Sequence, residues 1–379
     1  MNKYDHGGNI YSIKADPPGK ILDFSANTSP LGVPSGVLDA VRREAPGFGI
    51  YPDPLCGKLR EALGKHYRCD PERIVCGNGA ADLIYRIVRY ARPRQALVAA
   101  PSFSEYEKAL EAERAEIIFY PLAGPCFLGD RRILSFISAK TDMVFLCNPN
   151  NPTGILWDRR LMESVIDKCA DTGTIAVIDE CFNGFLDDPA GNSVQGFLDR
   201  APGLVILNAF TKVYGMAGFR LGYMLCGSGE TSRGIAGTGQ PWSVSAVAQT
   251  AGIAALKESS YITELRRLVK AERFFMKAAL ADLGLEVLGG EANYIFFRLG
   301  GDSGFEKPGF SVSLLSRGFL LRNCANYPGL DDSYYRICLR KHEENESLIQ
   351  ALQALRDGGG DGKEQQYNAP AGLPRGGIG

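Results

Sequence analysis

The chain has 379 residues, of which 45% are hydrophobic and 22% charged, and its net charge at pH 7 is −1. This length is sufficient for two domains with a large core. The near-zero charge argues against nucleic acid or an anionic membrane surface as a partner. No apolar run approaches the roughly 20 residues that span a bilayer, and the first residues, MNKYDHGGN, contain no signal-peptide core. We therefore expect a cytoplasmic protein.

Ten cysteines are spread along the chain, and none forms a CxxC pair. The three histidines, His6, His66 and His342, are far apart in the sequence. Structural zinc sites need closely spaced cysteine and histidine ligands, so we expect no metal. In a chain without a secretory signal, the cysteines are most simply reduced, buried thiols.

From residue 48 to about 255, short β-rich runs alternate with amphipathic stretches such as those at 81–91 and 159–171. The runs are RIVCGNG (73–79), QALVAAP (95–101), AEIIFYPL (115–122), TDMVFLCNP (141–149), TIAVIDE (174–180), LVILNAF (204–210) and LGYMLC (221–226). This alternation predicts an α/β domain with a mostly parallel sheet that helices cover on both faces.

The pattern changes towards the C-terminus. A long helical pattern at 260–284 is followed by short strands and a final helix near 342–356. We expect a smaller α+β domain over 256–356, with the N-terminal segment 1–47 packed against it. The last residues, 357–379, are rich in glycine and have little to bury, which predicts a disordered tail.

Ligands of open parallel sheets bind at the carboxyl ends of the strands, so the residues that follow each run matter most. In chain order these are Gly79, Ala80, Ala81, Phe103, Asn151, Asp179, Thr211, Lys212 and Arg220. Each of them alone has a plain structural explanation. Asp179 and Lys212 can form a buried ion pair, and Phe103 can belong to the core.

Together these residues match the groups of one ligand. Glycines at a helix N-terminus offer backbone N–H groups to a phosphate, and Arg220 can add charge-assisted bonds to it. Phe103 can stack on a flat ring, while Asp179 can pair with a protonated ring nitrogen. Asn151 can donate to a phenolic oxygen, and Lys212 can form a Schiff base with an aldehyde. A pyridine ring with a phosphate, a hydroxyl and an aldehyde is pyridoxal phosphate.

Several motifs also carry a family resemblance. The segments NPNNPTG (148–154), DECF (179–182), TKVYGMAGFRLGY (211–223) and YRICLR (335–340) resemble those of the fold-type I pyridoxal-phosphate enzymes, in the class I and II aminotransferase group. The resemblance covers residues 4 to about 356. Within the group, the chain is similar to the threonine-phosphate decarboxylases, and less so to the histidinol-phosphate aminotransferases, in HGGN (6–9), LDFSANTSPLG (22–32), YPDP (51–54), QPWSVS (240–245) and LRNCANYPGLDDSYYRICLR (321–340).

The resemblance implies a fold-type I architecture and a role for each matching residue. Lys212 would carry the cofactor as a Schiff base and later donate a proton, and Asp179 would bind the pyridine nitrogen. Phe103 would stack on the ring, and Asn151 would bind its 3-hydroxyl. The cofactor phosphate would be held by Gly79, Ala80, Ala81, Thr211, Arg220 and, from the other subunit of a homodimer, Tyr51. The substrate would be held by His6, Asn27, Asn151, Arg322 and Arg336.

The implied reaction is decarboxylation of threonine O-3-phosphate to 1-aminopropan-2-ol O-phosphate, a step in the synthesis of the cobalamin nucleotide loop. The alternatives are serine phosphate as the substrate, transamination of histidinol phosphate, and a non-catalytic protein on the same fold. In this chemistry the Cα bond perpendicular to the ring breaks, so the outcome depends on how Arg322 and Arg336 orient the substrate. Either arginine could instead form a surface salt bridge.

Three features depart from the family pattern. Phe182 stands where many relatives have tyrosine, and Ala209 stands three positions before the lysine, where serine or threonine is usual. The second change removes one bond to the cofactor phosphate, which we expect Thr211 or water to replace. The segment TSRGIAGTG (231–239) is rich in glycine where the relatives are helical.

Overall fold

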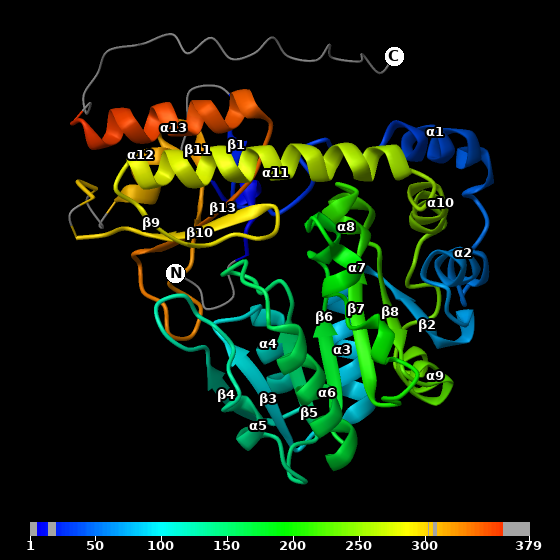
Figure 1. Ribbon diagram of the computed structural model, residues 1–379. Coiled ribbons are helices and arrows are strands. Elements are labelled where there is room, and N and C mark those ends of the chain that lie inside the picture. The colour runs from blue at the N-terminus through cyan, green and yellow to red at the C-terminus, as the bar shows by residue number, and fades with distance from the viewer. Residues whose placement is uncertain (1–5, 14–19, 302, 306–308, 359–379) are drawn as a thin grey trace.

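The computed structural model describes residues 6–13, 20–301, 303–305 and 309–358, which form three sheets with their helices (Figure 1). The predicted C-terminal tail lies outside the described residues from 359 onwards.

A seven-stranded sheet has the order β2-β8-β7-β6-β5-β3-β4. Its strands are β2 (Ile74–Gly77), β3 (Gln95–Ala100), β4 (Glu116–Pro121), β5 (Met143–Cys147), β6 (Ile175–Asp179), β7 (Leu204–Ala209) and β8 (Gly222–Cys226). All neighbours are parallel except β8, which is antiparallel to both β2 and β7. The predicted α/β fold with a mostly parallel sheet is confirmed, and each predicted run contains one of these strands.

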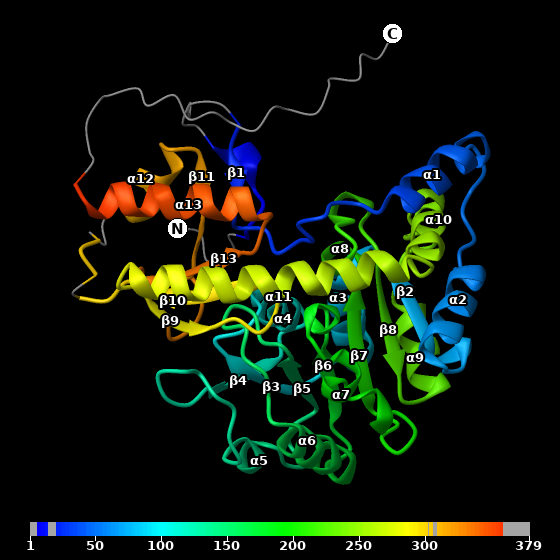
Figure 2. The same ribbon diagram turned by 45° about the horizontal axis from the view of Figure 1, so that its top comes forward.

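A four-stranded antiparallel sheet follows in the chain, with the order β12-β13-β10-β9. Its strands are β9 (Glu286–Gly289), β10 (Tyr294–Arg298), β12 (Arg322–Asn323) and β13 (Tyr334–Cys338). The helices of this part are α11 (Ser259–Asp282), α12 (Phe310–Leu315) and α13 (His342–Arg356). Figure 2 shows α11 and α13 side by side, with α11 on the strands of this sheet.

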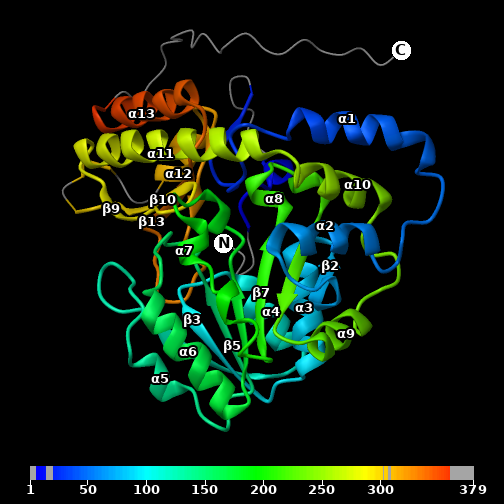
Figure 3. The same cartoon turned by 45° about the vertical axis from the view of Figure 1, so that its right-hand side comes forward.

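The helices that flank the large sheet or lie beyond its edge are α1 (Ser35–Glu44), α2 (Gly57–Tyr67), α3 (Gly79–Ala91), α4 (Ser104–Ala112), α5 (Ile133–Phe136), α6 (Arg159–Thr172), α7 (Pro189–Asn192), α8 (Phe210–Val213), α9 (Gly229–Gly237) and α10 (Ala246–Ala255). In β6, Val177 packs in one hydrophobic cluster with Leu83 of α3, whereas Ile178 packs in another with Leu161 of α6. Successive strand residues point to opposite faces, so both faces are buried. At one edge, α10 lies against α1 and α2 (Figure 3).

The N-terminal segment contacts both parts of the molecule. The short strand β1 (Leu22–Asp23) pairs in parallel with β11 (Phe319–Leu320), whereas α1 packs against α10. Between them, the backbone N–H of Ser29 donates to the carbonyl oxygen of Lys212 at 2.9 Å. The segment therefore passes over the end of β7. The domain boundaries at 47, 255 and 356 stay predictions.

The glycine-rich segment at 231–239 is largely helical, because α9 extends to Gly237. A Cβ atom at Gly234 would lie 2.1 Å from the ring of Tyr90 in α3, and one at Gly239 would lie 2.2 Å from the guanidinium of Arg86. Only glycine allows α9 and the following turn to approach α3 so closely. The unusual composition is thus explained by close packing of helices.

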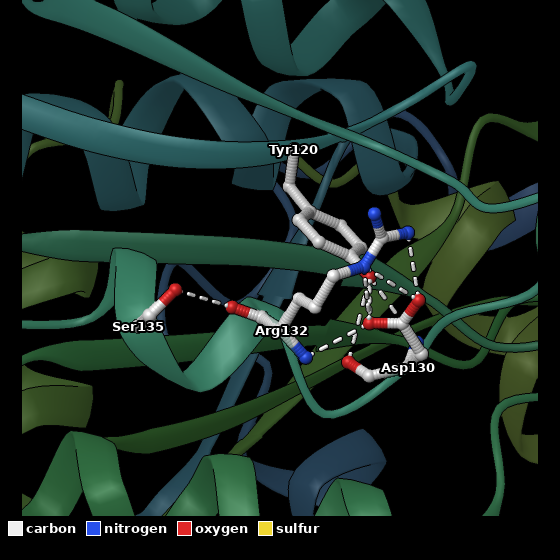
Figure 4. A network of polar contacts seen from close by, with 4 residues as sticks. All are labelled: Tyr120, Asp130, Arg132 and Ser135. Carbon is white, nitrogen blue, oxygen red and sulfur yellow. Dashed lines mark hydrogen bonds and ion pairs between the residues drawn. The ribbon is translucent and has the colours of Figure 1, made fainter.

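The loop that follows β4 has side-chain contacts with both main sheets. At its base, Nε of Arg132 donates to both carboxylate oxygens of Asp130, at 3.0 and 2.9 Å, and the hydroxyl of Tyr120 donates to Asp130 at 3.0 Å (Figure 4). The bond from Arg132 lowers the pKa of the Asp130 carboxyl to about 2. Nearer the tip, the ring of Phe127 meets Phe296 of β10 edge-on, with centroids 5.7 Å apart. The loop thus holds the small sheet beside the large one.

None of the described helices is both long and apolar enough to cross a bilayer. All ten cysteines are free thiols, and all except Cys69 and Cys126 are buried. Within the described ranges there is no group of three or more potential metal ligands. The thiols therefore contribute chiefly to packing.

Candidate active site

A cavity of about 790 Å³ opens at the carboxyl ends of the central parallel strands. The predicted residues in its wall are His6, Asn27, Ala80, Ala81, Phe103, Asn151, Asp179, Thr211, Lys212, Arg220 and Arg336. They come from the N-terminal segment, from the segments that follow the strands of the large sheet, and from β13. The structure therefore brings together most of the residues that the sequence placed at strand ends.

At one end of the cavity the backbone forms a cup. Helix α3 begins at Gly79, whose φ of +83° is a conformation that favours glycine. A Cβ atom there would lie 2.6 Å from Nη2 of Arg220, so this arginine reaches the start of the helix. Ala80, Ala81 and the buried Thr211 line the same cavity. A helix N-terminus beside a guanidinium suits a phosphate group, so these residues fit the predicted cofactor phosphate.

The carboxylate of Asp179 ends β6 and is only 5% exposed. Its Oδ2 accepts a hydrogen bond from the hydroxyl of Tyr106 at 2.6 Å, and its Oδ1 accepts one from the backbone N–H of Cys181 at 2.9 Å. These bonds, rather than an ion pair with Lys212, hold the carboxylate. Burial raises the pKa of Tyr106 well above its usual value, and the charge of Asp179 adds to this effect. Tyr106 therefore stays a hydrogen-bond donor.

Tyr106 was missed in the sequence, although it follows Phe103 by three residues. The two rings meet edge-on, with centroids 5.7 Å apart and planes at 85°. Phe103 directly precedes α4 and Tyr106 lies in its first turn, so the three-residue spacing brings the two rings together at the start of the helix. That spacing was a signal that could have linked the predicted stacking residue to the predicted carboxylate.

We expect Tyr106→Phe to weaken retention of the cofactor by about tenfold or more. The change keeps the ring but removes one hydrogen bond to the buried carboxylate, and a bond of that kind contributes about 1.5–3 kcal/mol. Absorbance of the retained cofactor during dialysis measures the effect. Tyr120→Phe is the matched control, because its hydroxyl bonds the carboxylate of Asp130 in a surface loop. Equal retention by the two variants would contradict the prediction.

Lys212 lies on α8, directly after β7, and its Nζ is 5.5 Å from the centroid of the Phe182 ring. Burial lowers the pKa of Lys212, and the positive charge of Arg336 lowers it further. A lowered pKa increases the fraction of neutral amine, which is the form that attacks an aldehyde. The position fits the predicted Schiff-base lysine.

The other end of the cavity contains polar groups that lack partners. Arg336 is buried, and its guanidinium donates to Oδ1 of Asn151 and, at 2.7 Å, to the carbonyl oxygen of Ser25. Both acceptors are neutral, so neither balances the charge. Asn27 is 2% exposed, and neither atom of its amide has a partner among the described residues. Buried polar groups normally have partners, so this end fits a polar, anionic ligand.

Besides Gly79, which lies at the edge of the cup, two predicted residues are not in the cavity wall. Tyr51 is 79% exposed, and its ring contacts Trp242 with centroids 4.9 Å apart. Arg322 is buried, but it donates to Oδ1 of Asn326 at 2.6 Å and lies over the ring of Tyr327. Because Tyr327 lines the cavity, Arg322 is one side chain removed from it. The roles assigned to Tyr51 and Arg322 stay predictions.

Glu180, next to Asp179, is a second buried carboxyl group with a strongly shifted pKa. It accepts hydrogen bonds from the backbone N–H of Val194 at 2.7 Å and the hydroxyl of Ser193 at 2.8 Å. Burial nevertheless raises the pKa of Glu180 to about 7, compared with about 4.3 in an unfolded chain. The folded state therefore binds more protons than the unfolded state between these two values.

We expect the free energy of unfolding to fall as the pH rises through this window, by up to about 3 kcal/mol from this one group. The contribution is fully present below about pH 4.3 and is lost above pH 7. Glu180→Gln should flatten this part of the profile, because glutamine cannot ionise. Urea unfolding at pH 5 to 8 measures the slope, with the exposed Glu61→Gln of α2 as the control. A Glu180→Gln profile parallel to that of the wild type would refute the assignment.

The chain matches known proteins over most of its length. The family model for aminotransferase class I and II matches residues 19–352. Threonine-phosphate decarboxylase of Salmonella typhimurium is 34% identical over 361 residues, which is 93% of this chain and 97% of the relative. The crystal structure of histidinol-phosphate aminotransferase from Clostridium acetobutylicum has a TM-score of 0.84 at 28% identity, covering 89% of this chain and 100% of that one. That of L-threonine-O-3-phosphate decarboxylase from Porphyromonas gingivalis has a TM-score of 0.76 at 27% identity, covering 88% and 99%.

These matches confirm the resemblance found in the motifs. The family model covers every strand of both the large and the small sheet, and the cavity is lined by groups that fit the family's cofactor. The chain belongs to the class I and II aminotransferase family of pyridoxal-phosphate-dependent enzymes.

Proposed function

We propose that the chain decarboxylates threonine O-phosphate to carbon dioxide and 1-aminopropan-2-ol O-phosphate, and that this product serves the cobalamin nucleotide loop. The observation that carries the proposal is the buried Arg336 beside the unpartnered Asn27. These groups suit an anionic substrate, and they lie in the same cavity as Lys212. The identity to the Salmonella decarboxylase over almost the whole chain supports the same reaction.

Within this proposal, the residues of the large sheet hold the cofactor. Gly79 and Arg220 hold its phosphate, Asp179 keeps its ring nitrogen protonated, and Tyr106 holds Asp179 in place. When bound, pyridoxal phosphate supplies an electron sink for the bond that breaks at Cα. Lys212 would hold the aldehyde of the cofactor.

The remaining residues orient the substrate and handle its proton. Arg336 and Asn27 would fix an anionic group of the substrate and so restrict its orientation in the cavity. Loss of carbon dioxide leaves an electron pair on Cα, and the ammonium of Lys212 supplies the proton that replaces the carboxylate. Asn151 links the residues proposed to hold the cofactor with those proposed to hold the substrate, because its Oδ1 accepts a hydrogen bond from Arg336.

Product analysis tests the proposal. The holoenzyme is incubated with threonine O-phosphate or serine O-phosphate alone, and with histidinol phosphate plus 2-oxoglutarate. We expect carbon dioxide from a phosphoamino acid without a keto acid. Glutamate from histidinol phosphate, with no carbon dioxide from either phosphoamino acid, would show that the chain is an aminotransferase.

The aminotransferase alternative has a specific observation in its favour. The histidinol-phosphate aminotransferase structure superposes better on this chain than the threonine-phosphate decarboxylase structure does. Serine phosphate is the closer alternative, because it lacks only one methyl group, and a methyl group in a pocket is worth only about 1–3 kcal/mol.

We also propose that the enzyme is a homodimer, in which Tyr51 completes the phosphate cup of the partner subunit. Tyr51 is part of an exposed apolar surface. Ile50 and Leu55 are close to it in the sequence, and the ring of Trp242 is in contact with its ring. Twofold association is the commonest arrangement of soluble oligomers. A second copy would bury this surface.

We expect inactive Tyr51→Ala and Lys212→Ala chains to regain activity when they are unfolded together and refolded. Half of the dimers would be mixed, and each mixed dimer would hold one intact site, so about a quarter of the sites should work. Activity of the mixture measures this fraction. The control mixes Tyr51→Ala with a chain that carries both substitutions, which should restore nothing. Full activity of Tyr51→Ala alone would exclude a shared site.

A further inference from the structure

Arg86, on α3, is a buried arginine that lies outside the cavity wall formed by the described residues. It is 6% exposed, and its guanidinium contacts two other side chains. Its Nη2 lies 2.8 Å from Oδ2 of Asp82, one turn earlier on the same helix, and its Nε donates to Oδ1 of Asp82 at 3.0 Å. Its Nη2 also donates to the hydroxyl of Ser243 at 2.7 Å. The guanidinium therefore joins the first turn of α3 to a residue that follows Arg86 by 157 positions.

Through Asp82, Arg86 reaches the turn that forms the cofactor phosphate cup. Oδ2 of Asp82 accepts a hydrogen bond from the backbone N–H of Asn78 at 2.8 Å. A Cβ atom at Gly77 would lie 2.8 Å from the same oxygen, so the carboxylate rests against this turn. Gly79, at which α3 begins, follows directly. The pair of Asp82 and Arg86 thus fixes the turn from β2 into α3, on which the direction of the cup's N–H groups depends.

Through Ser243, Arg86 reaches the segment QPWSVS (240–245), which has no role in the steps above. Trp242 has a φ of +55°, a conformation that is costly for a bulky residue, so contacts with the rest of the molecule must hold this turn. The bond from Arg86 to Ser243 is one such contact. The ring of Trp242 packs against the ring of Tyr51. Arg86 therefore supports the surface on which Tyr51 lies.

A second bond ties the same turn to the YPDP motif that contains Tyr51. Nε2 of Gln249, on α10, donates to the carbonyl oxygen of Val244 at 3.0 Å and to that of Asp53 at 2.9 Å. Asp53 follows Tyr51 by two residues. A displacement of the turn at 240–245 would therefore also displace the backbone that presents Tyr51.

We propose that Arg86 is a positioning residue for two cofactor cups at once. Through Asp82 it fixes the cup of its own subunit, and through Ser243 it fixes Tyr51 for the cup of the partner subunit. A guanidinium suits this task, because its planar set of donors can bond a carboxylate and a hydroxyl at the same time. The inference rests on the proposed homodimer, in which Tyr51 crosses to the partner.

The test is a cycle of single and double substitutions, measured by the release of pyridoxal phosphate from the holoenzyme during dialysis. We expect Ser243→Ala to release the cofactor about three- to tenfold faster, because one charge-assisted bond is lost while the pair of Arg86 and Asp82 stays in place. Tyr51→Ala should release it faster still, because the contact itself is lost. The double variant should release it no faster than Tyr51→Ala alone, because Ser243 acts only through Tyr51.

Arg86→Met should differ from Ser243→Ala in one respect. It also removes the contact with Asp82, so it should accelerate release by about a further tenfold even when Tyr51 is already replaced by alanine. If Arg86→Met does not fold, Asp82→Asn takes its place, because it keeps the size of the side chain and removes the charge that Arg86 contacts.

The outcomes separate this inference from the proposed dimer. Normal release from Tyr51→Ala would exclude the shared cup and the inference with it. If Tyr51→Ala does accelerate release, then unchanged release from Ser243→Ala, or an effect that multiplies with that of Tyr51→Ala, would overturn the inference alone. So would an Arg86→Met or Asp82→Asn effect that vanishes in the Tyr51→Ala chain. Ser228→Ala is the matched control, because it removes a hydrogen bond that caps α9 and should leave release unchanged.

Discussion

Lys212→Ala should abolish turnover while leaving the fold intact. The side chain would supply both the amine that binds the cofactor and the proton that reaches Cα, and loss of both functions should reduce kcat by roughly four orders of magnitude or more. Its backbone contact with Ser29 does not depend on the side chain, so the thermal midpoint should change little. Steady-state kinetics and thermal unfolding of the same preparation measure the two quantities.

Two further measurements test the proposed role of Lys212. The variant should still bind pyridoxal phosphate through the cup at Gly79 and Arg220, because those contacts are unchanged. Lys212→Arg should be as inactive as Lys212→Ala, because a guanidinium keeps the charge but forms no Schiff base. Near-normal activity of either variant would remove the basis of the proposed chemistry.

Arg336→Met is expected to cause the second largest loss, roughly two to four orders of magnitude in kcat/KM. The guanidinium can offer two charge-assisted bonds to a substrate anion, each worth about 1.5–3 kcal/mol. Retention of the cofactor should change far less, because Arg336 bonds Asn151 and Ser25 rather than the residues of the cup. Activity at varied substrate concentration and cofactor dissociation are measured side by side.

The residue across the strand pair provides the control. Arg322 is directly opposite Arg336 in the register of β12 and β13, is similarly buried, and carries the same charge. The predicted substrate contact of Arg322 implies that Arg322→Met lowers affinity for the phosphorylated substrate by about one to two orders of magnitude, whereas its bond to Asn326 outside the cavity wall implies a loss of about tenfold at most. If Arg322→Met were the more damaging change, the loop at 324–330 would have to rearrange around the substrate.

The sequence predicted the large sheet well, because all of its strands except the edge strand β4 are largely buried on both faces. Buried strands read as nearly continuous apolar runs, and each such run here contained a strand. The same rule located the cofactor end of the site, since strand ends of a parallel sheet meet at one edge. Asp179, Lys212 and Phe103 could therefore be linked without coordinates.

The residues at the end of the cavity proposed to bind the substrate were harder to predict from the sequence. Glu105 and Lys108, which line the cavity, read as ordinary charges of a surface helix, and only the path of the N-terminal segment brings His6 to them. The loop contacts of Arg322 depend on the conformation of residues 324–330, which no periodicity encodes. The surroundings of these side chains depend on contacts between segments far apart in the sequence, whereas the strands can be predicted from the local pattern of apolar residues.

The position of the N-terminal segment has a consequence for how the molecule is made. Residues 20 to 29 leave the ribosome well before residues 319 to 336, yet β1 pairs with β11, and Arg336 bonds Ser25. Contacts between segments so far apart in the chain form slowly, because a long loop must close first. The part of the cofactor cup that one chain supplies to itself, including Gly79 and Arg220, needs only residues up to about the end of β8. Nascent chains should therefore be able to capture pyridoxal phosphate before they can hold a substrate, and the catalytic cavity should be among the last parts of the molecule to form.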